Sequence, residues 1–232
     1  MSRLCTEALV VRTIEYGESD LIVTFLTEAA GKIGALVRAG RKSSKRVGGA
    51  LEPFHTVEAT LEDGRGELAT LREARILRMR PTIVGDLDAM EAAGTGLRWA
   101  RHLFPARTRE PEGYAVITEL LDRLDKADAP PRTELAVAAF RLLAAMGYAL
   151  EFERCVGCSK PCPEGRLSEI DALRGGLVCR ACGGGAHLLD AATRDAGKSF
   201  QRGGRPVLDP TQADSLLRLA DDAMAVHAGF DR

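Results

Sequence analysis

Apolar and polar residues follow the two-residue period of β-strands in the first eighty positions of the chain. Within residues 54–61 the two faces alternate strictly, Val57, Ala59 and Leu61 against Thr56, Glu58 and Thr60. Short runs rich in Val, Ile, Leu and Phe predict four more strands, at residues 8–14, 21–26, 33–37 and 68–71. Five short strands are typical of a small closed barrel such as the OB-fold, and an SH3-like barrel has the same strand count. We therefore expect an N-terminal OB-fold β-barrel over residues 1–80.

After Pro81 the apolar period changes from 2 to about 3.6 residues, which indicates helices. Three apolar stripes are formed by Leu87, Met90, Leu97 and Phe104, by Tyr114, Ile117, Leu121 and Leu124, and by Leu135, Ala139, Leu142 and Met146. A last helix is expected over residues 209–226, with a buried face of Leu216, Leu219, Ala220, Ala223 and Met224. We interpret these stripes as core. The predicted fold class is α+β, an all-β domain followed by an all-α domain over residues 81–232.

A segment rich in Cys and Gly interrupts the helical domain at about residues 152–187. It contains two matched pairs, Cys155 with Cys158 and Cys179 with Cys182, and twenty residues separate the pairs. Two residues between paired thiolates allow a tight turn to aim both sulfurs at one ion, and Gly157 favours such a turn. The spacing predicts one structural Zn²⁺ held by all four cysteines. Four protein ligands leave no position for a catalytic water.

Two nearby residues are spare candidates for the metal. Cys162 breaks the paired pattern and is interpreted as a bystander, and His187 would become a ligand only if one of the paired cysteines were misplaced. Two other readings of the cysteines remain open, as buried thiols or as a redox pair, although a second matched pair weakens the redox reading.

The composition describes an ordinary globular chain, with 45% hydrophobic and 28% charged residues. No apolar run approaches the roughly 18–20 residues that span a bilayer, so no membrane segment is expected. The N-terminus lacks the apolar core of a secretory signal, which predicts a cytoplasmic protein. In that reducing compartment, six cysteines are more often metal ligands than disulfides.

Charge is distributed unevenly, although the formal net charge is only −1. Between Glu28 and Glu52 the sequence has no acidic residue. The same stretch carries six cations, which are our candidates for contact with DNA: Lys32, Arg38, Arg41, Lys42, Lys45 and Arg46. On charge alone such a run is usually a solvated surface loop.

Motifs for nucleotide chemistry fail when they are checked. Gly197-Lys198-Ser199 resembles the end of a phosphate-binding loop, but the required first glycine falls at Ala192, and residues 188–191 do not read as a strand that feeds a helix. Gly94 and Gly96 lack the third glycine of a dinucleotide fingerprint. No Ser or Cys stands in a recognisable nucleophile motif. We therefore expect a protein that is not an enzyme.

Several short segments then occur in a characteristic order, residues 16–27, 31–33, 38–42, 51–54 and 71–74, followed by residues 155–158 and 175–182. Together they resemble the RecO family along the whole chain. That resemblance implies an N-terminal OB-fold and a helical domain with a zinc module set into it. It also implies binding to single- and double-stranded DNA, annealing of complementary strands, and loading of RecA together with RecR onto DNA coated by single-strand-binding protein.

The residues agree with this interpretation, because an annealing protein must grip phosphates and leave base edges free. Aromatic residues, which would stack on bases, make up only 5% of the chain. Three rival interpretations remain: a zinc-ribbon factor of transcription or translation, a metal-dependent hydrolase, and an interaction scaffold. Should the basic segment not be the contact, the next candidates are Arg72, Arg75, Arg78 and Arg80.

Overall fold

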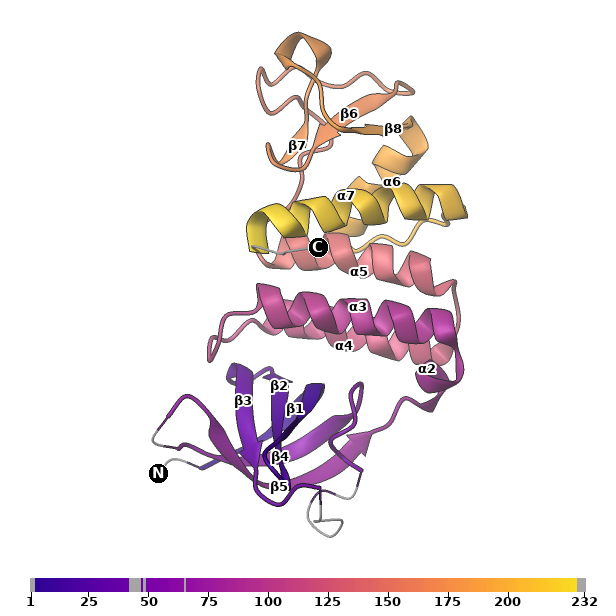
Figure 1. The fold of residues 1–232 in the computed structure, drawn as a ribbon. Helices are drawn as coiled ribbons and strands as arrows, with labels where there is room; N and C mark the ends of the chain where they lie inside the picture. Colours follow the sequence, from indigo (N-terminus) through magenta and orange to yellow (C-terminus); the bar gives the residue numbers. More distant parts are fainter. Residues whose placement is uncertain (1–2, 42–46, 48, 65, 229–232) are drawn as a thin grey trace. The chain divides into compact units, whose positions relative to one another are not determined.

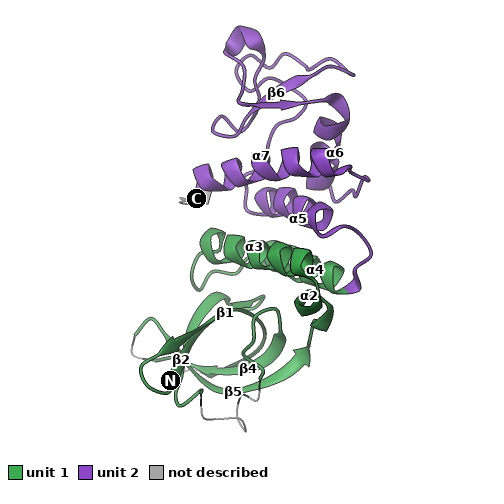
Figure 2. Cartoon of the chain, turned by 45° about the vertical axis from the view of Figure 1, so that its right-hand side comes forward, with its two compact units in different colours: residues 1–125 green, residues 126–232 purple. Residues whose placement is uncertain are grey.

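The computed structural model describes residues 3–41, 47, 49–64 and 66–228 of the chain. The chain forms two compact units, residues 1–125 and 126–232 (Figure 2). The first unit contains the β-sheet and the helices α2, α3 and α4, and the second contains the cysteine-rich segment and the helices α5, α6 and α7. The division of the chain into domains at residue 80 stays a prediction.

The first unit is built on five strands, as the alternation of residues predicts: β1 (Arg3–Tyr16), β2 (Asp20–Thr27), β3 (Gly31–Val37), β4 (Thr56–Glu62) and β5 (Ala69–Arg78) (Figure 1). The strand order is β1-β2-β3-β5-β4, and β1 pairs with both β2 and β4, so the sheet closes on itself. All pairings are antiparallel except that of β3 with β5. β1 is longer than its apolar run because its two halves pair with different strands.

The apolar core of the sheet lies on its inner face, where Val23, Phe25 and Val57 are completely buried. One part of the predicted alternation is wrong, because Thr56 and Thr60 are buried as well. Thr56 lies under Arg80, whose guanidinium donates to the Thr56 hydroxyl at 3.1 Å and to the Phe54 carbonyl at 2.5 Å. Arg80 is itself only 2% exposed and forms an ion pair with Asp122 at 2.7 Å. A hydrogen-bonded threonine can therefore occupy the predicted polar face and still be buried.

Three helices follow the sheet in the first unit: α2 (Pro81–Gly85), α3 (Leu87–Leu103) and α4 (Pro111–Lys126). Asp86 begins α3, because its carboxylate accepts the amide of Ala89 at 3.0 Å. The predicted stripe of α4 is confirmed, and its four members are buried. The stripe of α3 is wrong at Leu87 and Met90, which are exposed. The buried face of α3 consists mainly of small residues, Ala89, Ala92, Ala93, Gly96 and Ala100, together with Leu97 and Trp99.

The second unit packs three helices together: α5 (Pro131–Ala145), α6 (Ala191–Gln201) and α7 (Pro210–Ala228). Phe140 of α5 lies at their centre, with ring centroids 5.8 Å from Phe152 and 6.3 Å from Phe200. The predicted buried face of α7 is confirmed. In the predicted stripe of α5, Met146 is only half-buried, because the helix ends at Ala145 and Met146 caps it. Among the described residues, no helix is both long and apolar enough to cross a bilayer.

The cysteine-rich segment carries a small sheet of its own, with the strand order β7-β6-β8. Its elements are β6 (Ser168–Asp171), β7 (Gly176–Leu177), the short 3-10 helix η1 (Arg180–Cys182) and β8 (His187–Leu189). β8 leads directly into α6, which ties the segment to the helices of the second unit (Figure 1).

Candidate metal centre and nucleic-acid interface

Two turns of similar form position the four paired cysteines. In the first turn, the amide of Ser159 donates to the Cys155 carbonyl at 2.8 Å. In the second, the amides of Cys182 and Gly184 donate to the Cys179 carbonyl at 2.8 and 3.1 Å. β7 joins the two turns, because the amide of Val156 donates to the Leu177 carbonyl at 2.8 Å, and Cys179 follows Leu177 by two residues. These backbone hydrogen bonds therefore hold the two pairs next to each other.

The four thiols form a compact cluster. The Sγ atoms of Cys155, Cys158, Cys179 and Cys182 all lie within 4.8 Å of one another, and those of Cys158 and Cys179 are 3.7 Å apart. A tetrahedral thiolate site with metal–sulfur bonds of about 2.3 Å has sulfur–sulfur edges of about 3.8 Å. The cluster can therefore hold one metal ion with little movement. Four soft sulfur ligands suit zinc or an iron–sulfur centre.

Backbone amides already favour a thiolate in this cluster. Hydrogen bonding from the Cys179 amide, with further bonds from the Gly157 and Cys158 amides, lowers the pKa of Cys155 to about 6. The Cys179 amide lies 3.3 Å from the Cys155 sulfur. Sharing hydrogen bonds with Cys179, Cys158 and Cys155 raises the pKa of Cys182 to about 12. Since one negative sulfur disfavours the next, a cation is needed to keep all four deprotonated.

Gly157 is required in the first turn, but not for the reason that the sequence indicates. We expected it to adopt a turn geometry that other residues resist, yet its φ is not among the positive values found in the described residues. Space is the constraint: a Cβ at Gly157 would lie 2.9 Å from the Arg174 guanidinium and 3.2 Å from the Cys182 sulfur. Arg174 also donates to the Cys182 carbonyl at 2.9 Å, so it fixes the second turn from the side of the first.

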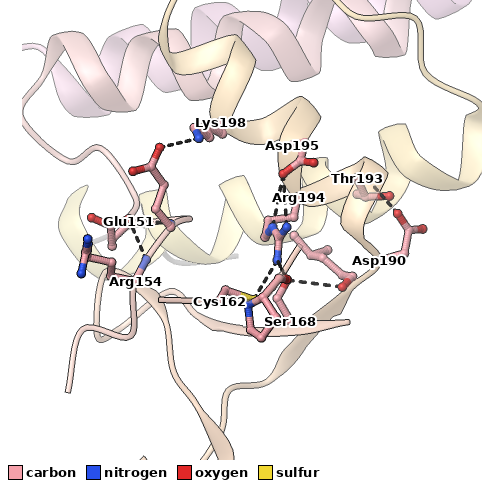
Figure 3. A network of polar contacts seen from close by, with 12 residues as sticks. Glu151, Arg154, Cys162, Ser168, Asp190, Thr193, Arg194, Asp195 and Lys198 are labelled. Carbon is pink, nitrogen blue, oxygen red and sulfur yellow. Dashed lines mark hydrogen bonds and ion pairs between the residues drawn. The ribbon is translucent and has the colours of Figure 1, made fainter. Parts of the chain in front are cut away.

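Cys162 lies outside the four-thiol cluster and belongs to a separate polar network (Figure 3). Its sulfur accepts a hydrogen bond from the Arg194 guanidinium at 2.7 Å, and Arg194 is only 5% exposed. The same guanidinium lies 3.3 Å from a carboxylate oxygen of Asp195. The interpretation of Cys162 as a bystander to the metal therefore agrees with its position between the module and α6.

His187 is also absent from the cluster. Its Nε2 lies 2.7 Å from a carboxylate oxygen of Asp222 on α7. His187 thus links β8 to the helices, as a polar tie between the module and the rest of the second unit.

Only part of the predicted DNA-contact segment lies within the described residues. Lys42, Lys45 and Arg46 lie outside them. Arg38 is exposed at the end of β3. Arg41 is placed by its amide, which donates to the Ser19 carbonyl at 3.1 Å, and its guanidinium lies 3.4 Å from the Glu15 carboxylate.

Lys32 has a more specific role than a surface charge. Its ammonium donates to the Arg101 carbonyl in the last turn of α3 at 2.5 Å, and burial lowers its pKa. Besides burial, the charges of Arg12 on β1 and Arg98 on α3 lower the pKa of Arg101. Burial and the charges of Arg101, Lys32 and Arg98 likewise lower the pKa of His102. Sequence reasoning missed these arginines, although residues 92–109 form a second stretch that contains no acidic residue.

The four arginines considered as the next candidates are all paired with carboxylates. Arg72 contacts Glu62 at 2.8 Å and Arg75 contacts Glu58 at 3.3 Å. Arg78 and Arg80 both contact Asp122. Their charges are therefore neutralised within the protein, which makes them weaker phosphate ligands than the sequence alone indicates.

The structure corrects one step in the rejection of a phosphate-binding loop. Residues 187–189 do form a strand, β8, and this strand does feed a helix, α6, which the sequence analysis did not predict. Gly197, Lys198 and Ser199 lie inside α6 and not in a loop before it. A Cβ at Gly197 would lie 3.0 Å from the Phe152 ring, so this glycine serves helix packing. A backbone cradle for phosphates is absent at this position.

The chain is a small modular protein that combines a closed five-stranded sheet, a helical region and a four-thiol module. The family model described as "Recombination protein O N terminal" matches residues 1–80, and the model described as "Recombination protein O C terminal" matches residues 84–231. The chain is also similar to proteins named DNA repair protein RecO. It is 35% identical to that of Anaeromyxobacter sp. (strain K), over 88% of this chain and 81% of the relative. It is 33% identical to the protein of that name from Geobacter sulfurreducens, over 95% of this chain and 91% of the relative. The chain therefore belongs to the RecO family.

Proposed function

We propose that this chain acts in DNA repair and homologous recombination as a mediator that binds single- and double-stranded DNA and anneals complementary strands. In this proposal it also helps to load RecA, together with RecR, onto DNA coated by single-strand-binding protein. The observation that carries the proposal is membership of the RecO family over both parts of the chain, residues 1–80 and 84–231. The relatives it resembles are named for DNA repair.

The N-terminal sheet supports the DNA-binding part of the proposal. We assign it to the OB-fold, since five strands close on themselves in the order β1-β2-β3-β5-β4 and oligonucleotide binding is frequent in that architecture. Phe25 is fully buried in the core, whereas Tyr16 is 55% exposed at the end of β1. With so little aromatic surface, the sheet suits contact with phosphates better than stacking on bases.

The four-thiol cluster supports a structural role for the metal, which we propose is one Zn²⁺. When bound, the ion would supply cross-linking between the two turns, and Cys155, Cys158, Cys179 and Cys182 would fill its tetrahedral positions. The module has five cations and five anions between residues 151 and 187, which gives little support to a zinc-ribbon factor that binds nucleic acid through this module. We propose binding, and not catalysis, as the activity of this chain.

The decisive experiment is strand annealing with purified protein and complementary labelled oligonucleotides, followed by fluorescence. We expect annealing to be faster than the spontaneous reaction and to proceed equally with and without ATP, because Gly197-Lys198-Ser199 lies inside a helix. No acceleration at any protein concentration would contradict the proposal. A strict requirement for ATP, or hydrolysis of ATP stimulated by DNA, would contradict its non-enzymatic part.

The basic segment is tested by changing Arg41, Lys42, Lys45 and Arg46 together to Ala. If these residues contact phosphates, binding should weaken to a similar degree for every DNA sequence, because phosphates carry no base information. The slope of log K against log salt should fall by about 0.7 for each lost contact with a single strand. The free energy of unfolding, followed by thermal unfolding, should change by no more than about 0.5 kcal/mol if the four residues are exposed. An unchanged salt slope in the folded variant would place the DNA contact elsewhere.

A further inference from the structure

One face of α3 carries positive charge close to the sheet. Residues 92–109 contain four arginines and one histidine but no acidic residue. Within this stretch, Arg98, Arg101 and His102 are spaced three and four residues apart, so they lie on one side of the helix. The opposite side contains Ala93, Gly96 and Ala100, which are buried.

The end of α3 is attached firmly to the start of β3. The Lys32 ammonium donates to the Arg101 carbonyl, and the amide of Arg107 donates to the Lys32 carbonyl at 3.0 Å. Gly31 is needed for this approach, since its φ is +68° and a Cβ there would lie 1.8 Å from the Thr108 carbonyl oxygen. Figure 1 shows α3 beside the strands of the sheet, and contacts with β1 confirm that the helix packs there. The charged face of α3 is thus held at a fixed place on the sheet.

Arg12 brings a further charge from β1. It follows an irregularity in the pairing of β1 with β2, lies opposite Thr24, and is exposed. Thr24 in turn lies opposite Gly34 of β3. The guanidinium of Arg12 therefore lies on the outer face of the sheet, the same side on which Lys32 meets α3.

The electrostatics of this region show that the charges act on one another. Burial and then the neighbouring Arg12 and Arg98 lower the pKa of Arg101. Burial and then Arg101, Lys32 and Arg98 lower the pKa of His102. Among the described residues, every charged group that shifts these two pKa values is positive.

Attraction to the negative end of α3 accounts for only part of this arrangement. Cations in the last turn of a helix interact favourably with its dipole, which suits Arg101 and His102. That effect fades within one turn, so it explains neither Arg12 on β1 nor the mutual repulsion that the cluster carries. A polyanion would relieve the repulsion, and regularly spaced phosphates fit a row of cations.

We propose that Arg12, Lys32, Arg98 and Arg101 form a phosphate-binding surface, a second DNA contact on α3 and the adjoining strands. This inference rests on the proposed function, because it names a further part of the surface that would hold DNA. Lys32 lies on the outward side of β3, and Arg38 directly follows the strand, six residues later, which corresponds to about 20 Å of extended chain. At about 3.4 Å for each phosphate along one strand, DNA of about six nucleotides would reach from the α3 surface to the start of the basic segment.

The experiment compares two double variants in binding a labelled 20-base-pair duplex over a series of KCl concentrations. Arg98→Gln/Arg101→Gln removes two charges from the surface, and Arg72→Gln/Arg75→Gln removes two charges that carboxylates already match. We expect the first variant to lower the salt slope by up to about 1.8, and to weaken binding on the order of tenfold to a hundredfold at 0.1 M salt. The second variant should match the parent. Arg98→Lys/Arg101→Lys should restore the slope, because an ammonium also binds phosphate.

Trp99 is the only tryptophan in the chain, and its fluorescence reports whether the unit around α3 is folded. Should the α3 variant not fold, Arg12→Gln on the exposed strand surface provides the same test, with an expected slope change of about 0.9. A folded variant with the slope of the parent would overturn the surface and leave the proposed function intact. Weaker binding with an unchanged slope would also overturn it, since it would indicate a purely structural role. Failure of the parent itself to bind DNA would instead refute the proposed function.

Discussion

The closed sheet and the four-thiol module are held together by different means. The sheet surrounds a continuous apolar core in which Val23, Phe25 and Val57 are completely buried. The module buries a smaller apolar set, which includes Ile170, Leu177 and Val178, and its Leu167 and Leu173 are 63% and 72% exposed. What the module has at its centre is four sulfur atoms within 4.8 Å of one another.

This difference shows that two parts of one chain can depend on separate stabilising interactions. Burial of apolar surface stabilises the sheet without any ligand, at about 25 cal/mol for each Å². With the proposed zinc ion bound, the module would gain part of its folding free energy from the metal, because the thiolate site does not exist in the unfolded segment. Removing the metal and removing a core side chain should therefore damage different regions.

The largest expected effect follows from Cys158→Ser/Cys179→Ser. Structural zinc contributes about 10–16 kcal/mol in zinc-finger peptides, so loss of two ligands should leave the module unfolded. Hydrogen exchange should show loss of protection at Val156 and Leu177, and elemental analysis should show almost no zinc. Protection at Val23 in β2 should stay. The matched control is Cys162→Ser, which should keep one zinc per chain, and full metal content in the double variant would contradict the assignment of the four ligands.

A smaller effect, in the opposite region, is expected from Phe25→Ala. Phe25 is fully buried in the core of the sheet, so its truncation should cost about 3–5 kcal/mol. Because the only tryptophan is Trp99 in the first unit, its fluorescence follows unfolding of that unit in denaturant. Metal content should be unchanged. Tyr16→Ala, at an exposed position, serves as the control and should cost less than about 0.5 kcal/mol. Loss of zinc in Phe25→Ala would show that the two regions are not independent.

The smallest expected effect concerns pH and His102. Burial and the charges of Arg101, Lys32 and Arg98 hold the pKa of His102 below its ordinary value of 6.5. A histidine with a lowered pKa binds fewer protons in the folded state than in the unfolded state, so its contribution to stability falls as the pH drops through about 6.5. Titration of His102 by NMR should give a pKa below 6.5 in the free protein.

DNA should then reverse this shift. Phosphates close to His102 stabilise its protonated form, so saturation with duplex DNA should raise the pKa of His102, and Arg98→Gln should raise it in the free protein. A His102 pKa that does not respond to DNA would argue against phosphate contact at α3.

The strands of the fold could be predicted from sequence because alternation is a local signal. Helices are harder to predict from sequence where their buried side is not made of large apolar residues. α3 packs through Ala92, Ala93 and Gly96, so Leu87 and Met90 only mimic a buried stripe. α6 escaped prediction because polar side chains, Thr193 and Arg194, occupy its buried face.

The candidate sites divide in a similar way. The metal-binding pairs could be predicted from the sequence, because the two cysteines of each pair lie within a single short turn. The surface around Lys32 could not be predicted from the sequence, because Arg12 and Arg98 are far apart in the chain. Both come close to Arg101 only when α3 packs beside β1. Ion pairs between arginines and carboxylates could not be predicted either, because nothing in the sequence near Arg72 shows that Glu62 neutralises its charge.

The long first strand has a consequence for how the protein is made. Leu9 pairs with Leu26 of β2 on one side and with Thr56 of β4 on the other, so β1 closes the sheet. On the ribosome, β1, β2 and β3 emerge before the partner that completes them. Until β4 and β5 have been synthesised, the nascent meander has open edges on both sides, where neighbouring chains on the same messenger can pair wrongly. Slow translation between residues 37 and 56 would prolong that exposure, and synonymous codons in this interval should therefore influence the yield of folded protein.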